Sequence, residues 1–365
     1  AHIDVVEALK ADWSPDLPPF VFTERDGYYY GRGTADDKAM ASIFVANVYR
    51  MKREGFVPDR DIIIALTADE ESGPANGVDW LLKNHKELVD AAMVINEGGG
   101  GTLRNGKPLF NSVQATEKIT TNFTLRVTNK GGHSSAPVKD NAIYQLADGL
   151  SRIAKFEFPF KLSATTRTYF ERRAALEPPA IAADMRAILK EQPDREALAR
   201  LYLVSPYNNA AVRTTCVATM LEAGHAENAL PQRAKATVNC RILPGERVAD
   251  VQATLAKVVA DDQIKITTTG NTTEAQVPPL TPELMRAVES ISADMWPGIP
   301  VIPVMSAGGT DGRFLNNAGI WTYGISGMFY PPEGSRAHGL NERLLVKSLY
   351  EGHEFLFRLG KRLGP

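Results

Sequence analysis

Residues 61–73 read Asp61-Ile62-Ile63-Ile64-Ala65-Leu66-Thr67-Ala68-Asp69-Glu70-Glu71-Ser72-Gly73, a short apolar run that ends in three consecutive acids. The apolar run over 61–67 predicts a buried strand, and 92–96 predicts a second one. A helix is expected between them over 78–88, and strand, helix and strand at this spacing favour a parallel sheet. Acidic residues follow both strands directly, and ligand sites in open α/β sheets collect at the carboxyl ends of strands. This stretch therefore predicts an α/β fold and the edge of its sheet that carries a site.

The same α/β pattern occurs at both ends of the chain. The expected elements are a helix over 39–53, a helix over 282–295, strands over 301–305 and 320–325, and a closing helix over 342–359. The helix at 282 has a typical start, with Thr281 as the cap and proline at the first position. We therefore assign 1–116 and 274–365 to one α/β domain with a mixed sheet.

The pattern changes near residue 116. The expected elements are an alternating strand over 122–127, a helix over 143–153, strands over 216–222 and 235–243, a helix over 251–258 and a strand over 264–268. Without a helical insert at about 161–203, this is the β-α-β-β-α-β order of ferredoxin-like α+β domains. We place this second domain at about 117–273, inserted into the first.

The composition is that of a globular protein, with 44% hydrophobic and 23% charged residues. The net charge is -2 and no run of basic residues occurs, which argues against a nucleic-acid partner. No apolar stretch is long enough to span a membrane. The two cysteines, Cys216 and Cys240, lie in strand-like segments, where buried free thiols are favoured over one disulfide. Neither belongs to a metal-binding Cys pair, so histidines and carboxylates would have to bind any metal.

The chain opens with Ala1-His2-Ile3-Asp4, without an initiator methionine or a leading strand. We interpret this start as that of a processed or truncated chain whose N-terminal part is missing. A targeting signal would lie in that part, so the compartment stays open between the cytoplasm and a secreted or periplasmic location.

The first candidate metal ligands are His2 and Asp36. Residues two apart on an extended chain face the same way, so Asp4 can reach the His2 ring and fix its tautomer. Asp36 lies in the glycine-rich stretch 31–38, which is alternatively a turn with a helix N-cap. A carboxylate in such a loop is also free to bridge two metal ions.

The acids at 69–71 are the sharpest local signal. Three adjacent carboxylates repel one another, so the arrangement costs stability unless a cation neutralises them. Adjacent side chains on extended backbone point in opposite directions, so Glu70 and Glu71 should differ in role. One can bind metal while the other faces the substrate as a general base. The alternative is a solvated acidic loop.

Two further candidates lie at segment ends. Glu97 precedes four glycines, which either let the backbone pass close to a site or form a flexible tip. His338 comes before the closing helix and is alternatively only a helix-start residue. If Asp36 bridges, one zinc takes His2, Glu97 and Asp36, and the other takes Glu71, His338 and Asp36. Each zinc then has three protein ligands and an open position, which is the pattern of catalytic sites.

The order of these motifs resembles that of the co-catalytic zinc peptidases, which include glutamate carboxypeptidase, succinyl-diaminopimelate desuccinylase, aminoacylase and carnosinase-like dipeptidases. The matching stretches, in chain order, are His2-Ile3-Asp4-Val5-Val6, Gly31-Arg32-Gly33-Thr34-Ala35-Asp36-Asp37-Lys38, Asp69-Glu70-Glu71-Ser72-Gly73, Asn96-Glu97-Gly98-Gly99, Gly131-Gly132-His133-Ser134-Ser135, Arg241-Ile242-Leu243-Pro244-Gly245, Gly308-Gly309-Thr310-Asp311 and Ala337-His338-Gly339. They cover nearly the whole chain.

The resemblance implies a zinc-binding catalytic domain and an inserted lid that carries a homodimer contact. The implied zinc ligands are His2, Asp36, Glu71, Glu97 and His338, with Asp36 bridging. Asp4 would orient His2, and Glu70 would be the general base. His133 matches a lid histidine that, in dimeric relatives, reaches the neighbouring active site and steadies the oxyanion. The resemblance also implies a cis peptide bond after Asp36.

The implied substrate site is in the lid and the loop after strand 301–305. Arg241 matches the lid arginine that holds a substrate carboxylate, for which a guanidinium fork is well suited. Asn228, Gly309 and Thr310 match positions that line the same pocket. Two departures from the family pattern stand out. The strand and helix that normally precede the His-x-Asp motif are missing, and the insert at 161–203 makes the lid larger.

These features predict a hydrolase with two Zn²⁺ ions, for which Co²⁺ or Mn²⁺ could substitute. The expected substrates are small peptides with a free α-carboxylate, cleaved by a carboxypeptidase or dipeptidase reaction. An N-acyl-amino-acid amidohydrolase of the aminoacylase or desuccinylase type is the alternative and uses the same metal chemistry. A non-catalytic binding protein on the same fold is the competing class, and the complete set of ligands and base argues against it.

Overall fold

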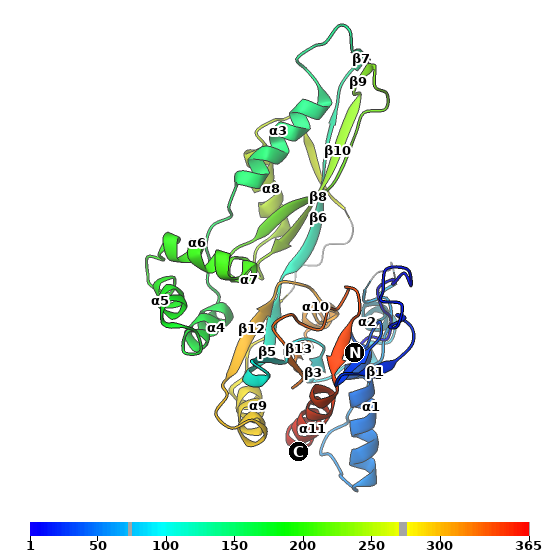
Figure 1. The fold of residues 1–365 in the computed structure, drawn as a ribbon, viewed down its shortest axis with the longest axis vertical. Helices are drawn as coiled ribbons and strands as arrows, with labels where there is room; N and C mark the ends of the chain where they lie inside the picture. The colour runs from blue at the N-terminus through cyan, green and yellow to red at the C-terminus, as the bar shows by residue number, and fades with distance from the viewer. Residues whose placement is uncertain (72–74, 270–275, 365) are drawn as a thin grey trace.

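The computed structural model describes residues 1–71, 75–269 and 276–364. Ser72 and Gly73 of the acidic motif, and the expected boundary at 273/274, lie outside the described residues. The molecule is elongated, with a broad α/β part that contains both termini and a narrow part that extends from it (Figure 1). The first and last thirds of the chain meet in the broad part.

The broad part contains a six-stranded mixed sheet. Its strands are β3 (Met93–Asn96), β4 (Gly101–Arg104), β5 (Lys107–Glu117), β12 (Val301–Ser306), β13 (Trp321–Gly324) and β14 (Phe329–Tyr330). The order is β14-β4-β5-β13-β3, and β12 also pairs with β5. The pairs β3–β13 and β5–β12 are parallel, whereas β4–β5 is antiparallel. The expected α/β fold with a mixed sheet is confirmed.

Helices cover this sheet with apolar faces. The helices are α1 (Lys38–Arg53), α2 (Gly77–Asn84), α9 (Pro282–Met295), α10 (Gly312–Asn317) and α11 (Val346–Leu363). The main core joins α1, α9 and α11 to the strands through Ile43, Val288, Phe355 and Tyr323. A smaller cluster between α2 and α10 contains Val78 and Leu315. The predicted helices at 39 and 282 are confirmed to within one residue at each end.

The predicted buried strand over 61–67 does not form. The segment has no assigned helix or strand, and its only pairing among the described residues is a bridge between His2 and Thr67. Ile62, Ile63 and Ile64 are 39%, 46% and 36% exposed. A groove of about 740 Å³ separates this segment from β3, so no neighbouring strand pairs with it or covers it. The apolar composition of the segment is typical of a strand. A strand also needs a neighbouring strand to pair with, and the composition of one segment does not reveal whether that neighbour exists.

The narrow part is built on a second, antiparallel sheet. Its strands are β6 (Ile119–Thr128), β8 (Thr215–Ala223), β10 (Arg233–Ile242) and β11 (Lys265–Thr269), in the order β11-β6-β10-β8. Helices α3 (Ala142–Lys155) and α8 (Val248–Val259) pack on one face through Leu146 and Leu255. β8 is an edge strand, and most of its residues are exposed. At the far end, β7 (Gly132–His133) pairs with β9 (Ala229–Leu230).

The helical insert packs on the large mixed sheet, whereas the sequence led us to expect it to enlarge the lid. It contains α4 (Ala164–Ala174), α5 (Pro179–Ala187), α6 (Arg195–Val204) and α7 (Pro206–Ala210). Its core residues Phe170 and Leu201 belong to the same cluster as Ile302 of β12 and Phe110 of β5. Helix α4 lies beside β12 (Figure 1). Helical periodicity gives the apolar face of each helix but not the surface that the face will cover.

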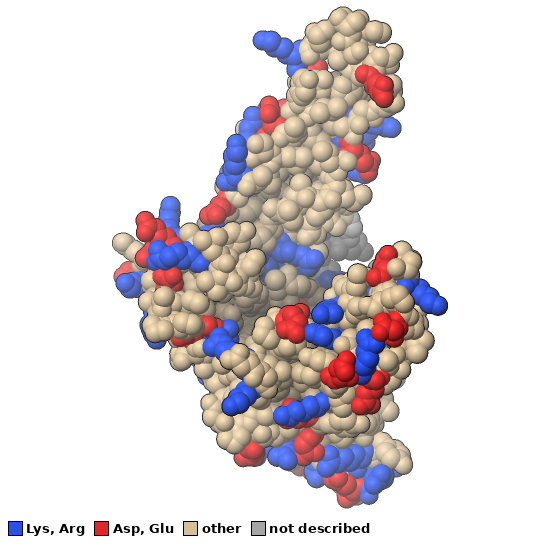
Figure 2. Space-filling model, viewed as in Figure 1, with Lys and Arg blue, Asp and Glu red and all other residues tan. Residues whose placement is uncertain are grey.

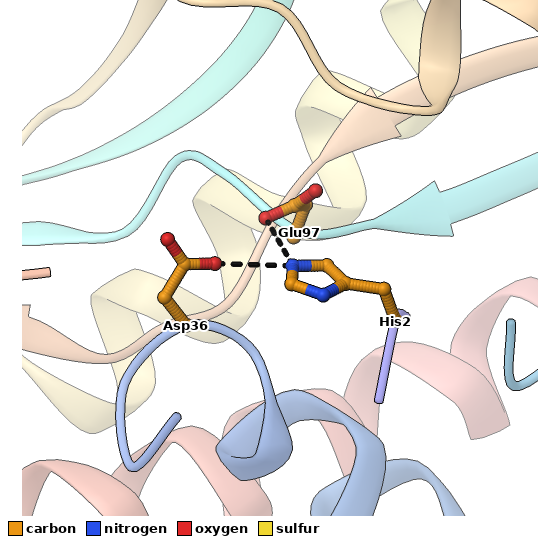
Figure 3. A group of neighbouring side chains, drawn as sticks. All are labelled: His2, Asp36 and Glu97. Atoms are coloured by element: carbon orange, nitrogen blue, oxygen red, sulfur yellow. Dashed lines mark hydrogen bonds and ion pairs between the residues drawn. The ribbon is translucent and has the colours of Figure 1, made fainter. Parts of the chain in front are cut away.

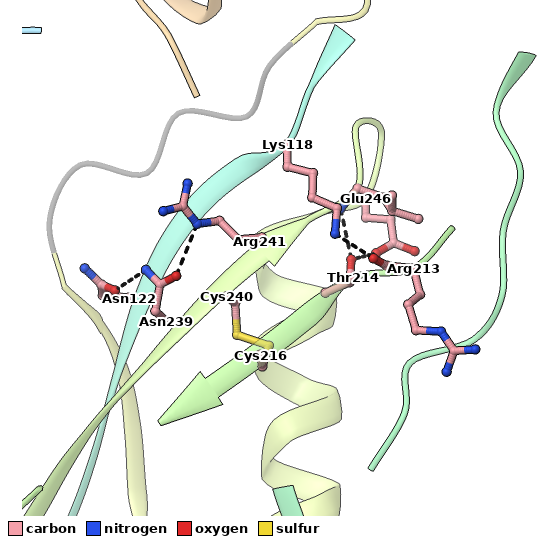
Figure 4. Close-up of a disulfide and its surroundings, with 10 residues drawn as sticks. Lys118, Asn122, Arg213, Thr214, Cys216, Asn239, Cys240, Arg241 and Glu246 are labelled. Atoms are coloured by element: carbon pink, nitrogen blue, oxygen red, sulfur yellow. Dashed lines mark hydrogen bonds between the residues drawn. A yellow bond between two sulfur atoms is a disulfide. The ribbon is translucent and has the colours of Figure 1, made fainter. Parts of the chain in front are cut away.

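Cys216 and Cys240 form a disulfide (Figure 4), which corrects the expectation of free thiols. The two residues are direct cross-strand partners in the β8–β10 pair, with Cα atoms 4.1 Å apart. Side chains at such positions point to the same face of the sheet, so the sulfur atoms meet. The register between two strands decides this contact, and sequence spacing does not reveal it.

The closing helix starts later than expected. Arg343–Leu345 forms β15, which pairs with β2 (Tyr28–Tyr30), and β2 pairs with β1 (Thr23–Arg25). Helix α11 therefore begins at Val346 instead of Glu342. Across the described ranges, no helix is both long and apolar enough to traverse a bilayer.

Candidate metal centre

Five segments of the broad part bring the predicted ligands together. His2 is held by backbone pairing at the bridge to Thr67, where the Ile3 amide donates to the Thr67 carbonyl over 2.8 Å. Asp36 lies in the loop before α1, and Glu97 follows β3. Glu71 follows the 61–67 segment, and His338 lies in the loop before β15. The expected cis peptide bond between Asp36 and Asp37 is present.

The first triad consists of His2, Asp36 and Glu97. The buried His2 imidazole points between the two carboxylates (Figure 3). Its Nε2 lies 3.1 Å from Asp36 Oδ1 and 3.6 Å from Glu97 Oε2. Burial alone would lower the pKa of His2, but the hydrogen bonds to Asp36 and Glu97 outweigh it and raise the pKa to about 12. The triad thus has a strong affinity for positive charge.

The second triad consists of Asp36, Glu71 and His338. The Nε2 atom of His338 lies 2.9 Å from Glu71 Oε2 and 3.2 Å from Asp36 Oδ2. Asp36 therefore presents one carboxylate oxygen to each triad. Burial and the nearby Asp36 charge raise the pKa of Glu71. The side chain of His338 is 58% exposed, so this triad faces the solvent side of the centre.

The donor atoms of both triads fit zinc. Each triad offers imidazole nitrogen and carboxylate oxygen atoms that lie within 4.8 Å of one another. Two atoms bound about 2.1 Å from one tetrahedral zinc lie roughly 3.4 Å apart. The four separations between donor atoms given above range from 2.9 to 3.6 Å. The side chains are thus already spaced as zinc ligands.

Asp4 supports both triads. Its Oδ1 lies 3.3 Å from His2 Nδ1, as predicted for a residue that orients the ring. Its backbone oxygen is also 3.2 Å from that nitrogen. Its Oδ2 accepts a hydrogen bond of 3.1 Å from the Glu71 amide, which the sequence did not indicate. One carboxylate therefore fixes a ligand of each triad.

At the glycines after Glu97 the chain packs closely against neighbouring strands, so these residues do not form a flexible tip. A Cβ atom on Gly99 would lie 2.4 Å from the Gly324 carbonyl oxygen and 2.9 Å from that of Ser112. Gly99 also has φ of 62°, a conformation that favours glycine. These glycines let the chain pass against β13 and β5 while Glu97 stays at the end of β3.

Glu342 holds the loop that carries Asp36, a role that the sequence analysis missed. It is fully buried and accepts a hydrogen bond of 2.7 Å from Arg32 Nη1. It also accepts from the backbone amides of Gly33, Ala35 and Asp36 at 3.1, 2.8 and 3.1 Å. Glu342 lies four residues after His338, so it ties the two loops of the second triad together. Arg32 lies in a quoted motif and Glu342 lies three residues after another, but nothing in the sequence pairs them.

Glu70 lies beside the triads without joining them. Burial, and then the charges of Glu97 and Asp311, raise the pKa of Glu70 to about 8. A carboxyl group with a pKa near neutrality is well suited to accept and return a proton. Asp311 is buried and accepts hydrogen bonds from the side chains of Asn76 and Thr67. Asp311 and Asn76 were not identified from the sequence as parts of this site.

The structure brings Arg241 and the Gly309-Thr310 turn together at the junction of the two parts. Arg241 Nη1 donates to Thr120 Oγ1 over 2.7 Å (its place on β10 is seen in Figure 4). A Cβ atom on Gly309 would lie 3.7 Å from the same oxygen. The amide and hydroxyl groups of Thr310 donate to Glu117 Oε2 at 3.0 and 2.8 Å.

Asn228 does not lie near Arg241, which corrects the expectation that both line one pocket. The carbonyl of Asn228 accepts a hydrogen bond of 3.0 Å from the Ser134 amide, so it lies beside exposed His133. Both residues are at the far end of the narrow part (Figure 1). The eight-residue step along β10 from Arg233 to Arg241 separates that end from Arg241 by roughly 26 Å. His133 and Asn228 are thus remote from the triads of their own chain.

Comparison with known proteins identifies the family of the chain. Residues 1–362 match the profile of peptidase family M20/M25/M40. The chain is 31% identical over 369 residues to the human N-fatty-acyl-amino acid synthase/hydrolase PM20D1, covering 98% of this chain and 72% of that protein. It is also 31% identical over 373 residues to the probable carboxypeptidase S-like 2 of Dictyostelium discoideum, covering 99% and 70%.

A solved structure shows the same fold. The M20 family metallo-carboxypeptidase Sso-CP2 from Sulfolobus solfataricus superposes with a TM-score of 0.67 at 20% identity. The match covers 99% of this chain and 83% of that chain. The chain therefore shares its fold with a solved structure.

Proposed function

Because the chain belongs to peptidase family M20/M25/M40, it is a metal-dependent hydrolase of peptide or amide bonds, and we propose that it is a carboxypeptidase or dipeptidase with two zinc ions. The observation that carries this proposal is the pair of triads that share Asp36, with Glu70 beside them. A second group of residues, around Arg241, lies where the two parts meet.

We assign the ligands as the geometry groups them. His2, Glu97 and Asp36 would hold one ion, and Glu71, His338 and Asp36 would hold the other. When bound, two zinc ions would polarise the scissile carbonyl and lower the pKa of water. Co²⁺ or Mn²⁺ would fit the same nitrogen and oxygen donors.

Glu70 is proposed as the general base. Its carboxylate accepts a proton from the attacking water as the C–O bond forms at the carbonyl carbon. The same proton then passes from Glu70 to the nitrogen of the leaving group as the C–N bond breaks. The raised pKa of Glu70 suits both steps because the carboxyl group must take up and release the proton at neutral pH.

Arg241 is proposed to bind the α-carboxylate of the substrate, with Gly309 and Thr310 lining the same pocket. Guanidinium groups bind carboxylates through paired N–H donors. The half-buried position of Arg241 strengthens such an interaction, because burial reduces competition from water.

The elements of residues 117–269 outside the helical insert are proposed to form a ferredoxin-like lid that dimerises. Edge strand β8 exposes Val217, Met220 and Leu221, at 60%, 58% and 63% of their surface. An exposed apolar edge of this kind is a ready pairing surface for a second copy. In such a dimer the partner's lid would bring its histidine at position 133 to the metal centre and steady the oxyanion there. Asn228 would accompany it.

An N-acyl-amino-acid amidohydrolase remains the second candidate. It is favoured by the human relative, whose name gives N-fatty-acyl-amino acids as its substrates. The metal centre and the proposed carboxylate pocket would serve both reactions, since both substrate classes carry a free α-carboxylate. A non-catalytic binding protein is the competing class, and it requires that the triads take up no zinc.

The deciding experiment uses the zinc-loaded protein and a panel of dipeptides, N-acyl amino acids and their C-terminal amides. Cleavage of the free acids and not of the amides is expected. Glu70→Gln should retain zinc and lose turnover, whereas the exposed-residue control Glu54→Gln should keep both. Full activity of Glu70→Gln would remove Glu70 from the mechanism. No zinc after reconstitution would favour the non-catalytic class.

A further inference from the structure

A second guanidinium lies next to the proposed carboxylate pocket. Arg313, at the start of α10, places its Nη1 3.2 Å from the point that a Cβ atom on Gly309 would occupy. The same point is 3.7 Å from Thr120 Oγ1, which accepts a hydrogen bond from Arg241. Arg313 and Arg241 therefore approach Gly309 from the two parts of the molecule. Basic side chains face the hollow between these parts (Figure 2).

Neither guanidinium forms an ion pair with another described residue. Arg241 donates to the neutral groups of Thr120 and Asn239, and Arg313 stacks on Phe314, with its Cζ 4.6 Å from the ring centroid. In the described part of the chain, no carboxylate lies within ion-pair distance of either. Buried Glu117 interacts electrostatically with Arg313 at longer range, and its Oε2 accepts both Thr310 donors.

The two positive charges disfavour each other. Burial, and then the Arg313 charge, lower the pKa of Arg241. Two half-buried like charges cost stability, and an anion between them would reduce that cost. Buried Lys118 does not offer a third positive group to the same anion, because its ammonium donates to the Arg213 carbonyl at 2.7 Å (Figure 4).

Gly309 leaves space between the two arginines. Its φ is not in the left-handed region, so the backbone conformation does not require glycine there. A side chain at this position would instead crowd Arg313, because the Cβ contact is tighter than ordinary van der Waals distance. Bare backbone at Gly309 therefore keeps the surface beside both guanidiniums open.

We propose that Arg313 and Arg241 bind the same substrate carboxylate, one from the broad part and one from the lid, so that Arg313 determines specificity for a free acid. This inference rests on the proposed function, which supplies the carboxylate. A carboxylate has about four acceptor positions on its two oxygens, so it can take N–H donors from both guanidiniums at once.

The test compares Arg241→Ala, Arg313→Ala, the double variant and Arg313→Lys, with Arg286→Ala as the control. Arg286 is exposed on α9, so its variant also loses one positive charge but nothing at the junction. For the best free-acid substrate, Arg313→Ala should raise KM at least about tenfold, or about 1.4 kcal/mol, and leave kcat within about twofold. Arg313→Lys should restore part of this loss.

The double variant identifies a shared ligand. If one carboxylate binds both arginines, the double variant should lose clearly less than the product of the two single losses. An unchanged KM in Arg313→Ala, or equal losses for the free acid and for its C-terminal amide, would overturn the proposal. So would a loss of the same size in Arg286→Ala.

A binding measurement separates this proposal from the proposed function. Calorimetry with an N-acetyl amino acid and its amide, in the Glu70→Gln background, needs no turnover. If no substrate of the panel is cleaved, the proposed function fails, yet acid-selective binding that Arg313→Ala abolishes would still support the arginine pair. Binding of acid and amide with equal affinity, or no binding of the acid, would overturn it.

Discussion

Replacing Glu342 by Gln should destabilise the protein and weaken the metal centre together. The fully buried carboxylate accepts hydrogen bonds from Arg32 and from three backbone amides of the loop that carries Asp36. Glutamine has nearly the same shape, so packing is conserved. The substitution removes the negative charge that faces Arg32. It also replaces one acceptor oxygen by an NH2 group, which then faces the N–H donors of Arg32 and of the loop backbone.

The expected loss is large because the Arg32 charge stays buried. Breaking a buried ion pair from one side costs about 3–5 kcal/mol, since the remaining charge is uncompensated. Each backbone amide of the loop that loses its acceptor adds a further cost of about 1–3 kcal/mol. We therefore expect a loss of at least about 3 kcal/mol in the free energy of unfolding. Zinc affinity should fall by about 10- to 100-fold, as is usual when a residue that supports a ligand is lost.

Urea unfolding of the metal-free protein and zinc titration of the folded protein measure the two effects separately. Glu54→Gln is the matched control, because Glu54 forms an exposed i,i+4 ion pair with Arg50 on α1. Such pairs contribute about 0.3–0.5 kcal/mol. If Glu342→Gln lost less than about 1 kcal/mol and bound zinc as before, the assigned role of Glu342 in holding the Asp36 loop would be wrong.

Three further predictions follow from other contacts. Asp4→Asn should lower zinc affinity about 10- to 100-fold because Asp4 orients His2, and a metal titration with unchanged affinity would contradict this. Burial lowers the pKa of Lys118 from 10.5 to about 7. The charged, buried ammonium therefore lowers the free energy of unfolding by its full amount below pH 7, and this destabilisation disappears as the pH approaches 10.5. Urea unfolding should accordingly show wild type gaining up to about 1.4 kcal/mol per pH unit relative to Lys118→Met between pH 7 and 9, and a constant difference would count against it. Replacing both Cys216 and Cys240 by Ala should cost about 3 kcal/mol in the free energy of unfolding, and an equal Tm with and without the disulfide would disprove this estimate.

The convergence of the five candidate ligands was predictable because each of them lies next to a local signal. Glu97 follows a strand and precedes glycines, and Glu71 belongs to a run of acids that needs a cation. The order of the motifs then grouped Asp36 and His338 with them. Such signals lie within a few residues of each ligand, so they survive without knowledge of the fold.

Features that depend on pairing between distant segments were not predictable. The strand expected over 61–67 has no partner strand, and the Cys216–Cys240 disulfide depends on the register of β8 and β10. Asn228 was placed beside Arg241 because motif order contains no distance, whereas β10 holds them apart. Arg32 meets Glu342 across 310 residues, and no local pattern joins them.

All five ligands of the two triads belong to the broad part, and one carboxylate, that of Asp36, faces both. The spacing of the two proposed ions would therefore be set by the width of a single carboxylate and by ligands that all belong to one part of the molecule. A swing of the narrow part would leave that spacing unchanged while it carries Arg241 toward or away from Gly309. Mutations at the junction of the two parts should therefore alter how tightly a substrate acid binds to Arg241 without altering how the five proposed ligands are arranged.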